Sequence, residues 1–200
     1  MQQLASTAGL MISQVKEWGE IITGFETQNK YVVSDEDGNV LYVAGEEGGS
    51  LLARWFLKAL RPFTIELRDG EHRPVLQVQR PFRFFFHRAE IRDAAGDPIG
   101  SVERRFAFFR RKYAIFDGDG REIFQLFGPL LRPWTFRIMA DGGEIGKITK
   151  KWSGLLKESF SDADNFALLY PRDWDARLKA LLLGTVFLID FVHFENTGKD

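Results

Sequence analysis

The sequence predicts a mainly β protein of about ten to twelve antiparallel strands, with one apolar helix near the C-terminus. Two observations carry this prediction. Turns rich in Asp and Gly recur every 22 to 34 residues between segments of alternating hydrophobicity, and the longest apolar run lies at residues 180–189. So many strands close into a barrel or stack as a sandwich, because both arrangements protect strand edges. A chain of 200 residues suits a single domain.

The predicted hairpins begin with their turns. Asp-Gly pairs supply the positive φ that tight hairpins need. The flanking segments, for example residues 63–67 (FTIEL) and 75–78 (VLQV), alternate with the period of two that is typical of half-buried strands. The turns are residues 35–38 (DEDG), 69–70 (DG), 95–97 (AGD), 117–120 (DGDG) and 141–143 (DGG).

The apolar run at residues 180–189 (ALLLGTVFLI) is too short for a membrane span, which needs about 20 residues. Burial inside the protein is the first reading, with an interfacial or re-entrant segment as the alternatives. A barrel of this size needs a filler, and this helix is apolar around most of its circumference. Gly184 would allow close approach to a strand, and a buried Asp190 would need a hydrogen-bond partner near the barrel mouth. The side chains expected to face the interior are Leu181, Leu182, Val186, Phe187, Leu188 and Ile189.

Composition narrows the functional class. With 27 basic and 28 acidic residues the net charge is −1, so any preference for lipid or nucleic acid must come from local patches. The absence of cysteine excludes disulfides and thiolate metal sites. Residues 1–14 do not resemble a signal peptide, so a secretory leader is not expected.

The connectors between the predicted hairpins combine aromatic and cationic residues. Arg and Lys beside Phe and Trp are typical of a membrane interface and also of single-stranded nucleic-acid sites. Alternatively, the rings pack on the barrel while the cations extend past them. Residues 51–60 have the spacing of an amphipathic helix, which would lie in an interface or close one end of the barrel. The candidate membrane or lipid contacts are Arg54, Trp55, Phe56, Lys58, Arg83, Phe84, Phe85, Phe86, Arg104, Arg105, Phe108, Phe109, Arg110, Arg111 and Lys112.

Several segments, in order, resemble the phospholipid scramblase family of the tubby-like (LURP-one-related) superfamily. The resemblance covers residues 10–195, and its last two motifs are the most specific. The matching segments are residues 23–31 (TGFETQNKY), 61–64 (RPFT), 79–82 (QRPF), 97–102 (DPIGSV), 146–150 (GKITK) with Trp152 and Gly154, 162–166 (DADNF) and 187–191 (FLIDF).

This resemblance implies a tubby-like fold, a closed antiparallel barrel of twelve strands around a central hydrophobic C-terminal helix. It also implies calcium-stimulated, ATP-independent, bidirectional movement of phospholipids between leaflets. The chain lacks the Pro-rich N-terminal region and the palmitoylated cysteines of eukaryotic members, which suggests a short bacterial member. Exposed Trp and Phe would then replace acyl chains at the membrane. The expected organisation is a helical or flexible segment 1–22, a barrel domain 23–195 that contains the helix 174–194, and a tail 196–200.

The resemblance places a weak calcium site in residues 162–173. Asp162, Asp164 and Asp173 fall at positions 1, 3 and 12 of an EF-hand-like spacing, and Asn165 adds an oxygen nearby. Phe at position 5 and Ala at position 6 depart from that pattern, so millimolar affinity is expected. Alternatively, residues 166–170 form the last strand, and the carboxylates cap the turn into the helix.

No enzymatic chemistry is expected. The three histidines, His72, His87 and His193, lie in separate segments without HExxH spacing, and neither a phosphate loop nor a nucleophile elbow occurs. Two hypotheses follow: a membrane-associated scramblase-like protein that contacts anionic headgroups, or a soluble barrel that binds a phosphoinositide, an apolar ligand, nucleic acid or a protein. Nucleic acid is the less favoured partner. The expected location is the membrane, by peripheral contact or shallow insertion, or else the cytoplasm.

Overall fold

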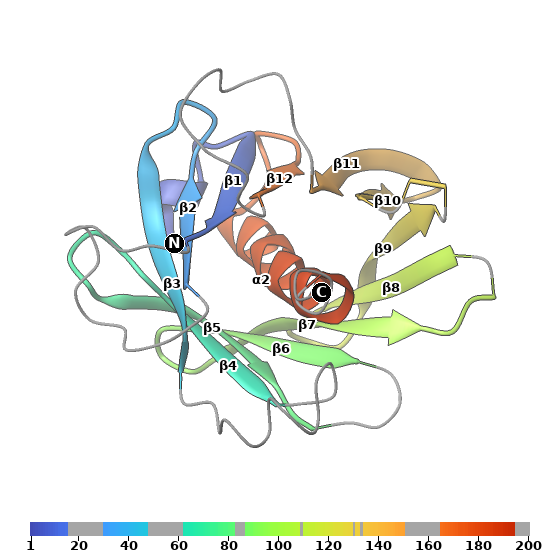
Figure 1. Cartoon of the computed structure of the whole chain (residues 1–200), viewed down its shortest axis with the longest axis horizontal. Helices are drawn as coiled ribbons and strands as arrows, with labels where there is room; N and C mark the ends of the chain where they lie inside the picture. Colours follow the sequence, from blue (N-terminus) through green and yellow to red (C-terminus); the bar gives the residue numbers. More distant parts are fainter. Residues whose placement is uncertain are drawn as a thin grey trace.

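The protein, in a computed structural model, is a closed β-barrel with one helix through its middle (Figure 1). The structure describes residues 1–15, 30–47, 62–82, 87–108, 110–129, 131–132, 134–150 and 165–194. The helix is α2 (Ala176–His193), and a short 3-10 helix, η1 (Gln2–Leu4), precedes the first strand. The strands are β1 (Gly9–Gln14), β2 (Lys30–Ser34), β3 (Val40–Glu47), β4 (Phe63–Arg68), β5 (Pro74–Arg80), β6 (Arg88–Asp93), β7 (Pro98–Arg105), β8 (Arg110–Asp117), β9 (Glu122–Pro129), β10 (Thr135–Ala140), β11 (Gly143–Thr149) and β12 (Asn165–Leu169).

The topology is an up-and-down meander. Each strand pairs antiparallel with its neighbours in sequence, and β1 pairs with β12 to close the barrel. The prediction of about twelve antiparallel strands around a C-terminal helix is therefore confirmed, and the structure selects the barrel over the sandwich. Closure removes exposed strand edges.

The tight turns follow a more specific hydrogen-bond pattern than an Asp-Gly pair alone would predict. In four of them an Asp carboxylate accepts the backbone N–H groups two and four residues later; Asp117 Oδ1, for example, lies 3.0 Å from Asp119 N and 2.9 Å from Arg121 N. The residue three positions after the Asp then has positive φ. That residue is Gly at 38, 96 and 120, but it is His72 (φ 61°) in the second turn, so Gly70 does not supply the expected conformation there.

The predicted N-terminal boundary is wrong. Residues 1–22 were expected to lie outside the barrel, but β1 pairs with both β12 and β2. Leu10 and Ile12 are buried in the core. The strand is short and follows no Asp-Gly turn, so the hairpin pattern that marks the other strands does not mark it.

Helix α2 fills the barrel. Every residue from Lys179 to Phe191 is buried, including the six apolar side chains expected to face the interior. Gly184 lies so close to β6 that a Cβ there would stand 2.5 Å from Ile91 Cγ1. The helix therefore passes nearer to this wall than any side chain at residue 184 would allow.

Candidate functional site

The two ends of the barrel differ in the length of their connections. In an antiparallel meander successive connections fall at alternate ends. The five tight turns lie at one end, which we call the turn end. The other end, which we call the connector end, joins the strands through residues 15–29, 48–62, 81–87, 106–109, 130–134 and 150–164. Helix α2 points its C-terminus at the connector end, where His193 Nε2 lies 2.8 Å from the hydroxyl of Tyr113 near the start of β8.

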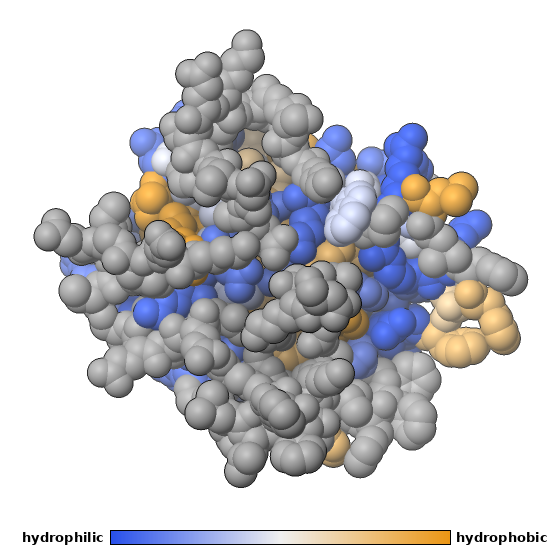
Figure 2. Space-filling view, in the orientation of Figure 1, coloured by the Kyte–Doolittle hydropathy of each residue, from blue (hydrophilic) through white to orange (hydrophobic). Residues whose placement is uncertain are grey.

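Exposed apolar side chains gather at the connector end. Six large apolar side chains are exposed in the described part of the chain, and only Val40 lies at the turn end. The other five, which we call the apolar rim, are Phe82, Phe106, Phe108, Leu131 and Trp134. Phe108 is 82% exposed and Leu131 is 96% exposed. Figure 2 shows orange groups at the right-hand edge, over the β7–β8 and β9–β10 connections of Figure 1. Exposed Phe and Leu side chains at loop tips are typical of surfaces that contact a membrane or another protein.

Inside this rim, cations face the barrel interior around the C-terminal turn of α2. Arg104 pairs in register with Tyr113, which is fully buried against α2. Arg111 lies two residues before Tyr113, on the same face of β8, with its guanidinium 4.5 Å from the ring centroid of Phe136. Strand alternation therefore turns both arginines toward the mouth of the barrel.

A third arginine enters the mouth from β5. Arg80 is 1% exposed, its guanidinium lies 4.9 Å from the ring centroid of Phe191, and it forms a short hydrogen bond with His87 Nδ1. Burial, Arg80 and Arg104 lower the pKa of His87 to about 4. Burial, Arg111, Arg104 and His87 lower the pKa of His193 to about 3. Both histidines are therefore neutral at pH 7 and add no charge to the three arginines.

The rest of the mouth is aromatic, with two buried carboxylates. Tyr31 donates its hydroxyl hydrogen bond to Asp190 Oδ2 at 2.8 Å, so Asp190 has the partner that a buried carboxylate needs. Glu46 is the second buried carboxylate of this end. Lys150 Nζ lies 4.1 Å from the ring centroid of Phe194, which stacks on Trp134 at 5.6 Å. The mouth is thus a cationic and aromatic ring around the end of α2.

The strand register sorts the predicted contact residues into two faces. Arg104 and Arg111 point inward, whereas Arg105 and Lys112 are cross-strand partners on the outer face. There Arg105 lies over the Phe116 ring and Lys112 over the Phe127 ring, at 5.4 and 5.3 Å, as the packing alternative described. Arg110 and Phe108 are exposed. Outside the described residues lie Arg54, Trp55, Phe56, Lys58, Arg83, Phe84, Phe85, Phe86 and Phe109.

Sequence reasoning missed Arg80, His87, His193 and Tyr113 as members of this site. The histidines lie far apart in the chain, so no sequence motif links them. One available signal was the alternation of tight turns and long connectors along the chain. In a meander this alternation places every long connector at the same end of the barrel. The second signal was alternation, which assigns Arg104 and Arg111 to one face once a neighbouring residue is known to be buried.

The acidic segment does not form one continuous loop. Residues 165–169 are β12, and Asp175 caps α2 by accepting the Arg177 backbone N–H at 2.7 Å, as in the strand alternative. Asn165 begins β12 at the connector end, whereas Asp173 follows it at the turn end, beyond a strand of about 13 Å. These two candidate ligands therefore do not meet.

With Asp173 at the other end of the barrel, the remaining candidate calcium ligands lie at or just before the start of β12. Asp162 and Asp164 lie outside the described residues. Asn165 Oδ1 is buried and accepts no hydrogen bond, so it is a polar atom that an ion or a water could satisfy. Within the described ranges, His, Asp and Glu side chains form no group of three that could hold a metal.

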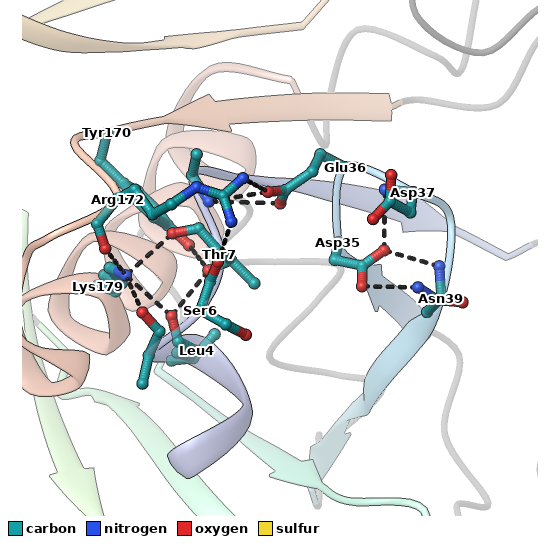
Figure 3. A network of polar contacts seen from close by, with 12 residues as sticks. Leu4, Ser6, Thr7, Asp35, Glu36, Asp37, Asn39, Tyr170, Arg172 and Lys179 are labelled. Carbon is teal, nitrogen blue, oxygen red and sulfur yellow. Dashed lines mark hydrogen bonds and ion pairs between the residues drawn. The ribbon is translucent and has the colours of Figure 1, made fainter.

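The turn end is held by a buried lysine (Figure 3). Lys179, on the first turns of α2, is fully buried, and four backbone carbonyl oxygens surround its ammonium group. The distances from Nζ are 3.0 Å to Leu4 O, 2.8 Å to Ala5 O, 2.9 Å to Thr7 O and 2.8 Å to Arg172 O. This lysine ties the N-terminal segment and the β12–α2 link to the helix. Its role is structural because its donors are consumed by backbone.

The two neutral histidines predict a pH dependence of stability. Each has a folded-state pKa below the value of about 6.5 expected when unfolded, so the unfolded chain binds more protons as the pH falls. Stability is therefore complete above about pH 6.5 and declines toward pH 4 for His87 and pH 3 for His193. Allowing for partial exposure, we expect a loss on the order of 2 kcal/mol between pH 7 and pH 5.

Thermal unfolding measured across this pH range tests the histidine effect. The variant His193→Phe should flatten the decline. A wild-type melting temperature that is constant from pH 7 to pH 5 would contradict the assignment.

Among the helices of the described chain, none has both the length and the apolar character needed to cross a bilayer.

Comparison with known proteins agrees with the fold and identifies the family. The Scramblase family model matches residues 1–196. Phospholipid scramblase 1 of Mus musculus is 32% identical over 214 residues, which cover 100% of this chain and 65% of the mouse protein, and so less than two thirds of its length. Phospholipid scramblase family member 5 of Homo sapiens is 31% identical over 98% of this chain and 78% of its own length.

A solved structure shares the fold at lower identity. The X-ray structure of a protein from Arabidopsis thaliana aligns with a TM-score of 0.57 and 16% identity, over 95% of this chain and 96% of that one. At this identity the similarity concerns the fold alone. The family match across nearly all of the sequence carries the assignment: the chain belongs to the Scramblase family.

Proposed function

We propose that the chain is a membrane-associated phospholipid-binding protein that promotes ATP-independent, bidirectional movement of phospholipids between leaflets, and that it docks through its connector end. Its relatives are named phospholipid scramblases, and it spans only part of their length. The observation that carries the proposal is the asymmetry of the barrel. Among the described residues, five of the six exposed large apolar side chains, together with Arg80, Arg104 and Arg111, lie at one end.

The arrangement of exposed rings and flanking cations at the connector end matches the apolar and headgroup layers of a membrane surface. Phe106 and Phe108, in edge-to-face contact at 4.9 Å, project from a connection flanked by cations on β7 and β8. Aromatic rings are favoured at headgroup level, and each nearby cation gains about 1 kcal/mol from an anionic surface. Inserted rings would disturb lipid packing locally, which would lower the barrier to headgroup transfer.

Two variants with matched chemistry test the docking surface in vesicle flotation. Phe106→Ser/Phe108→Ser removes exposed apolar surface from the connector end, and Val40→Ser removes it from the turn end, where Val40 is 58% exposed. On vesicles of phosphatidylcholine and phosphatidylserine we expect the double variant to lose about tenfold or more in affinity. Val40→Ser should float like the wild type. Equal flotation of all three proteins would reject the docking surface.

A dithionite leaflet assay with a fluorescent lipid tests lipid movement on the same vesicles. Wild-type protein should make about all of the label accessible, instead of the outer-leaflet half. Flotation without this increase would remove the scrambling activity and leave a membrane-binding module.

The second candidate is a soluble binding barrel. It is favoured by the complete burial of α2 from Lys179 to Phe191, because the helix fills the barrel and is not available to the bilayer. Failure of the wild type to float, even with anionic lipid, would select this candidate.

We also propose weak calcium binding at the start of β12, by Asp162, Asp164 and Asn165, without Asp173. The buried and unsatisfied Asn165 Oδ1 supports it. Calorimetry should give a millimolar dissociation constant that Asp162→Asn/Asp164→Asn weakens and Asp173→Asn does not. Micromolar binding, or equal losses in both variants, would contradict this ligand set.

A further inference from the structure

Within the described residues, the mouth of the barrel holds more cations than carboxylates. Arg80, Arg104 and Arg111 face inward there, while the buried carboxylates of this end are Asp190 and Glu46. The C-terminus of α2 adds about half a negative charge. Lys150 at the mouth raises the positive side to four, so an excess of more than one charge remains within the described residues.

Among the described cations of the mouth, Arg104 and Arg111 have side chains with hydrogen-bonding capacity to spare. Neither forms an ion pair with a carboxylate within the described ranges; Arg111 reaches only a carbonyl, Arg132 O, at 3.4 Å. Their outward neighbour Arg105, by contrast, lies 3.4 Å from a Glu103 oxygen and 3.8 Å from a Glu122 oxygen. Both inward arginines are half-exposed, so a ligand can reach them.

The electrostatic effects of Arg104 and Arg111 converge on His193. Arg104 lowers the pKa of both His87 and His193, which lie on different elements, and Arg111 acts on His193 from the neighbouring strand. Guanidinium groups recognise phosphate by paired N–H donors, and two of them suit the several oxygens of one phosphate group. The ring of Phe136, 1% exposed, lies 4.5 Å from the Arg111 guanidinium and backs it.

We propose that Arg104 and Arg111 form a phosphate-binding pair at the mouth of the barrel, which takes the phosphate of an anionic phospholipid headgroup. The pair lies on the two strands that carry the Phe106–Phe108 tip, about 7 Å along the strand from it. The tip would contact apolar lipid while the pair holds the phosphate beneath it. The lipid source of the phosphate rests on the proposed membrane function, whereas phosphate recognition itself does not.

The test compares two double variants that remove the same charge. Arg104→Gln/Arg111→Gln alters the inward pair, and Arg105→Gln/Lys112→Gln alters their sequence neighbours on the same strands but on the outer face. The first readout is affinity for vesicles that contain phosphatidic acid, against vesicles of equal charge that contain cholesteryl hemisuccinate, which has no phosphate. The second is thermal stabilisation by soluble glycerol 3-phosphate.

We expect the inward variant to lose about tenfold or more in affinity for phosphatidic acid vesicles, and the outward variant at most about threefold. On hemisuccinate vesicles the two should lose equally. Stabilisation by glycerol 3-phosphate should vanish only in the inward variant. If the wild type responds to glycerol 3-phosphate but binds no vesicle, the pair recognises a free phosphate and the proposed membrane function fails.

Equal losses in the two double variants on phosphatidic acid vesicles would overturn the pair, because a diffuse surface charge predicts that result. A wild type that does not distinguish the two kinds of vesicle, and is not stabilised by glycerol 3-phosphate, would overturn it too. The single variant Arg104→Gln keeps the test decisive if the double variant unfolds, since the Arg104 side chain donates no hydrogen bond within the described structure.

Discussion

Replacing Lys179 by Met is expected to lower the melting temperature by about 10 °C or more. Methionine fills a similar volume but leaves the carbonyls of Ala5, Thr7 and Arg172 without their donor, whereas the Leu4 carbonyl still accepts from the Thr7 backbone N–H and hydroxyl. An unsatisfied buried polar group costs about 1–3 kcal/mol, so partial recovery by water still leaves a loss of about 3–5 kcal/mol. In a chain of this size each kcal/mol corresponds to about 2–4 °C.

The loss should be local as well as global. Hydrogen exchange at residues 4–7 should accelerate more than exchange in β8, because the lysine holds the N-terminal segment against α2. Arg177→Met is the matched control: it lies two residues earlier on the helix, with its side chain 53% exposed. A melting temperature for Lys179→Met within 2 °C of the Arg177→Met value would contradict this role.

Replacing Gly184 by Val is expected to destabilise the protein by about 2–3 kcal/mol, despite the higher helix propensity of Val. The new Cβ would meet Ile91 Cγ1 at 2.5 Å and Val78 Cγ2 at 3.3 Å. Both neighbours are fully buried. The helix must therefore shift away from β5 and β6, which disturbs its packing along the barrel.

A double-mutant cycle with Ile91→Ala measures this contact. Alone, Ile91→Ala should cost about 2–5 kcal/mol through the cavity that it leaves. In the Gly184→Val background it should cost less, because the added side chain fills that cavity, with a coupling of at least about 1 kcal/mol. Chemical denaturation of the four proteins gives the values, and additive effects would place Gly184 away from Ile91.

Local chemistry made most of the barrel predictable. Each Asp-Gly turn marks two strands, so the hairpins from β2 to β11 could be read from the turns between them. The helix was expected at residues 174–194 and occupies Ala176–His193. Its apolar run made it predictable, because such a run is stable only when it is buried. β1 was not found, since its pairing with β12 joins residues that are about 160 positions apart and depends on closure.

The site was only partly predictable because it depends on register. The segment 104–112 was recognisable as basic and aromatic, but only the pairing of Arg104 with Tyr113 shows which cations face the mouth. The partners of Lys179 are backbone carbonyls, three near the N-terminus and one at Arg172, and every residue of any sequence carries such a group. From the sequence alone, a buried Lys179 beside the apolar run therefore could not be distinguished from a lysine exposed to solvent at the end of a helix.

The central claim, that the connector end faces the membrane, can be measured with single fluorescent labels because the chain contains no cysteine. An environment-sensitive dye would be placed in separate variants at Phe108→Cys and Leu131→Cys at the connector end, and at Val40→Cys and Asp119→Cys at the turn end. Vesicles of phosphatidylcholine and phosphatidylserine should shift the emission of the first two to shorter wavelength. Quenchers in the acyl chains should reduce the same two signals, and leave the turn-end labels unchanged. Membrane-bound protein whose turn-end labels respond, or whose connector-end labels do not, would contradict the account.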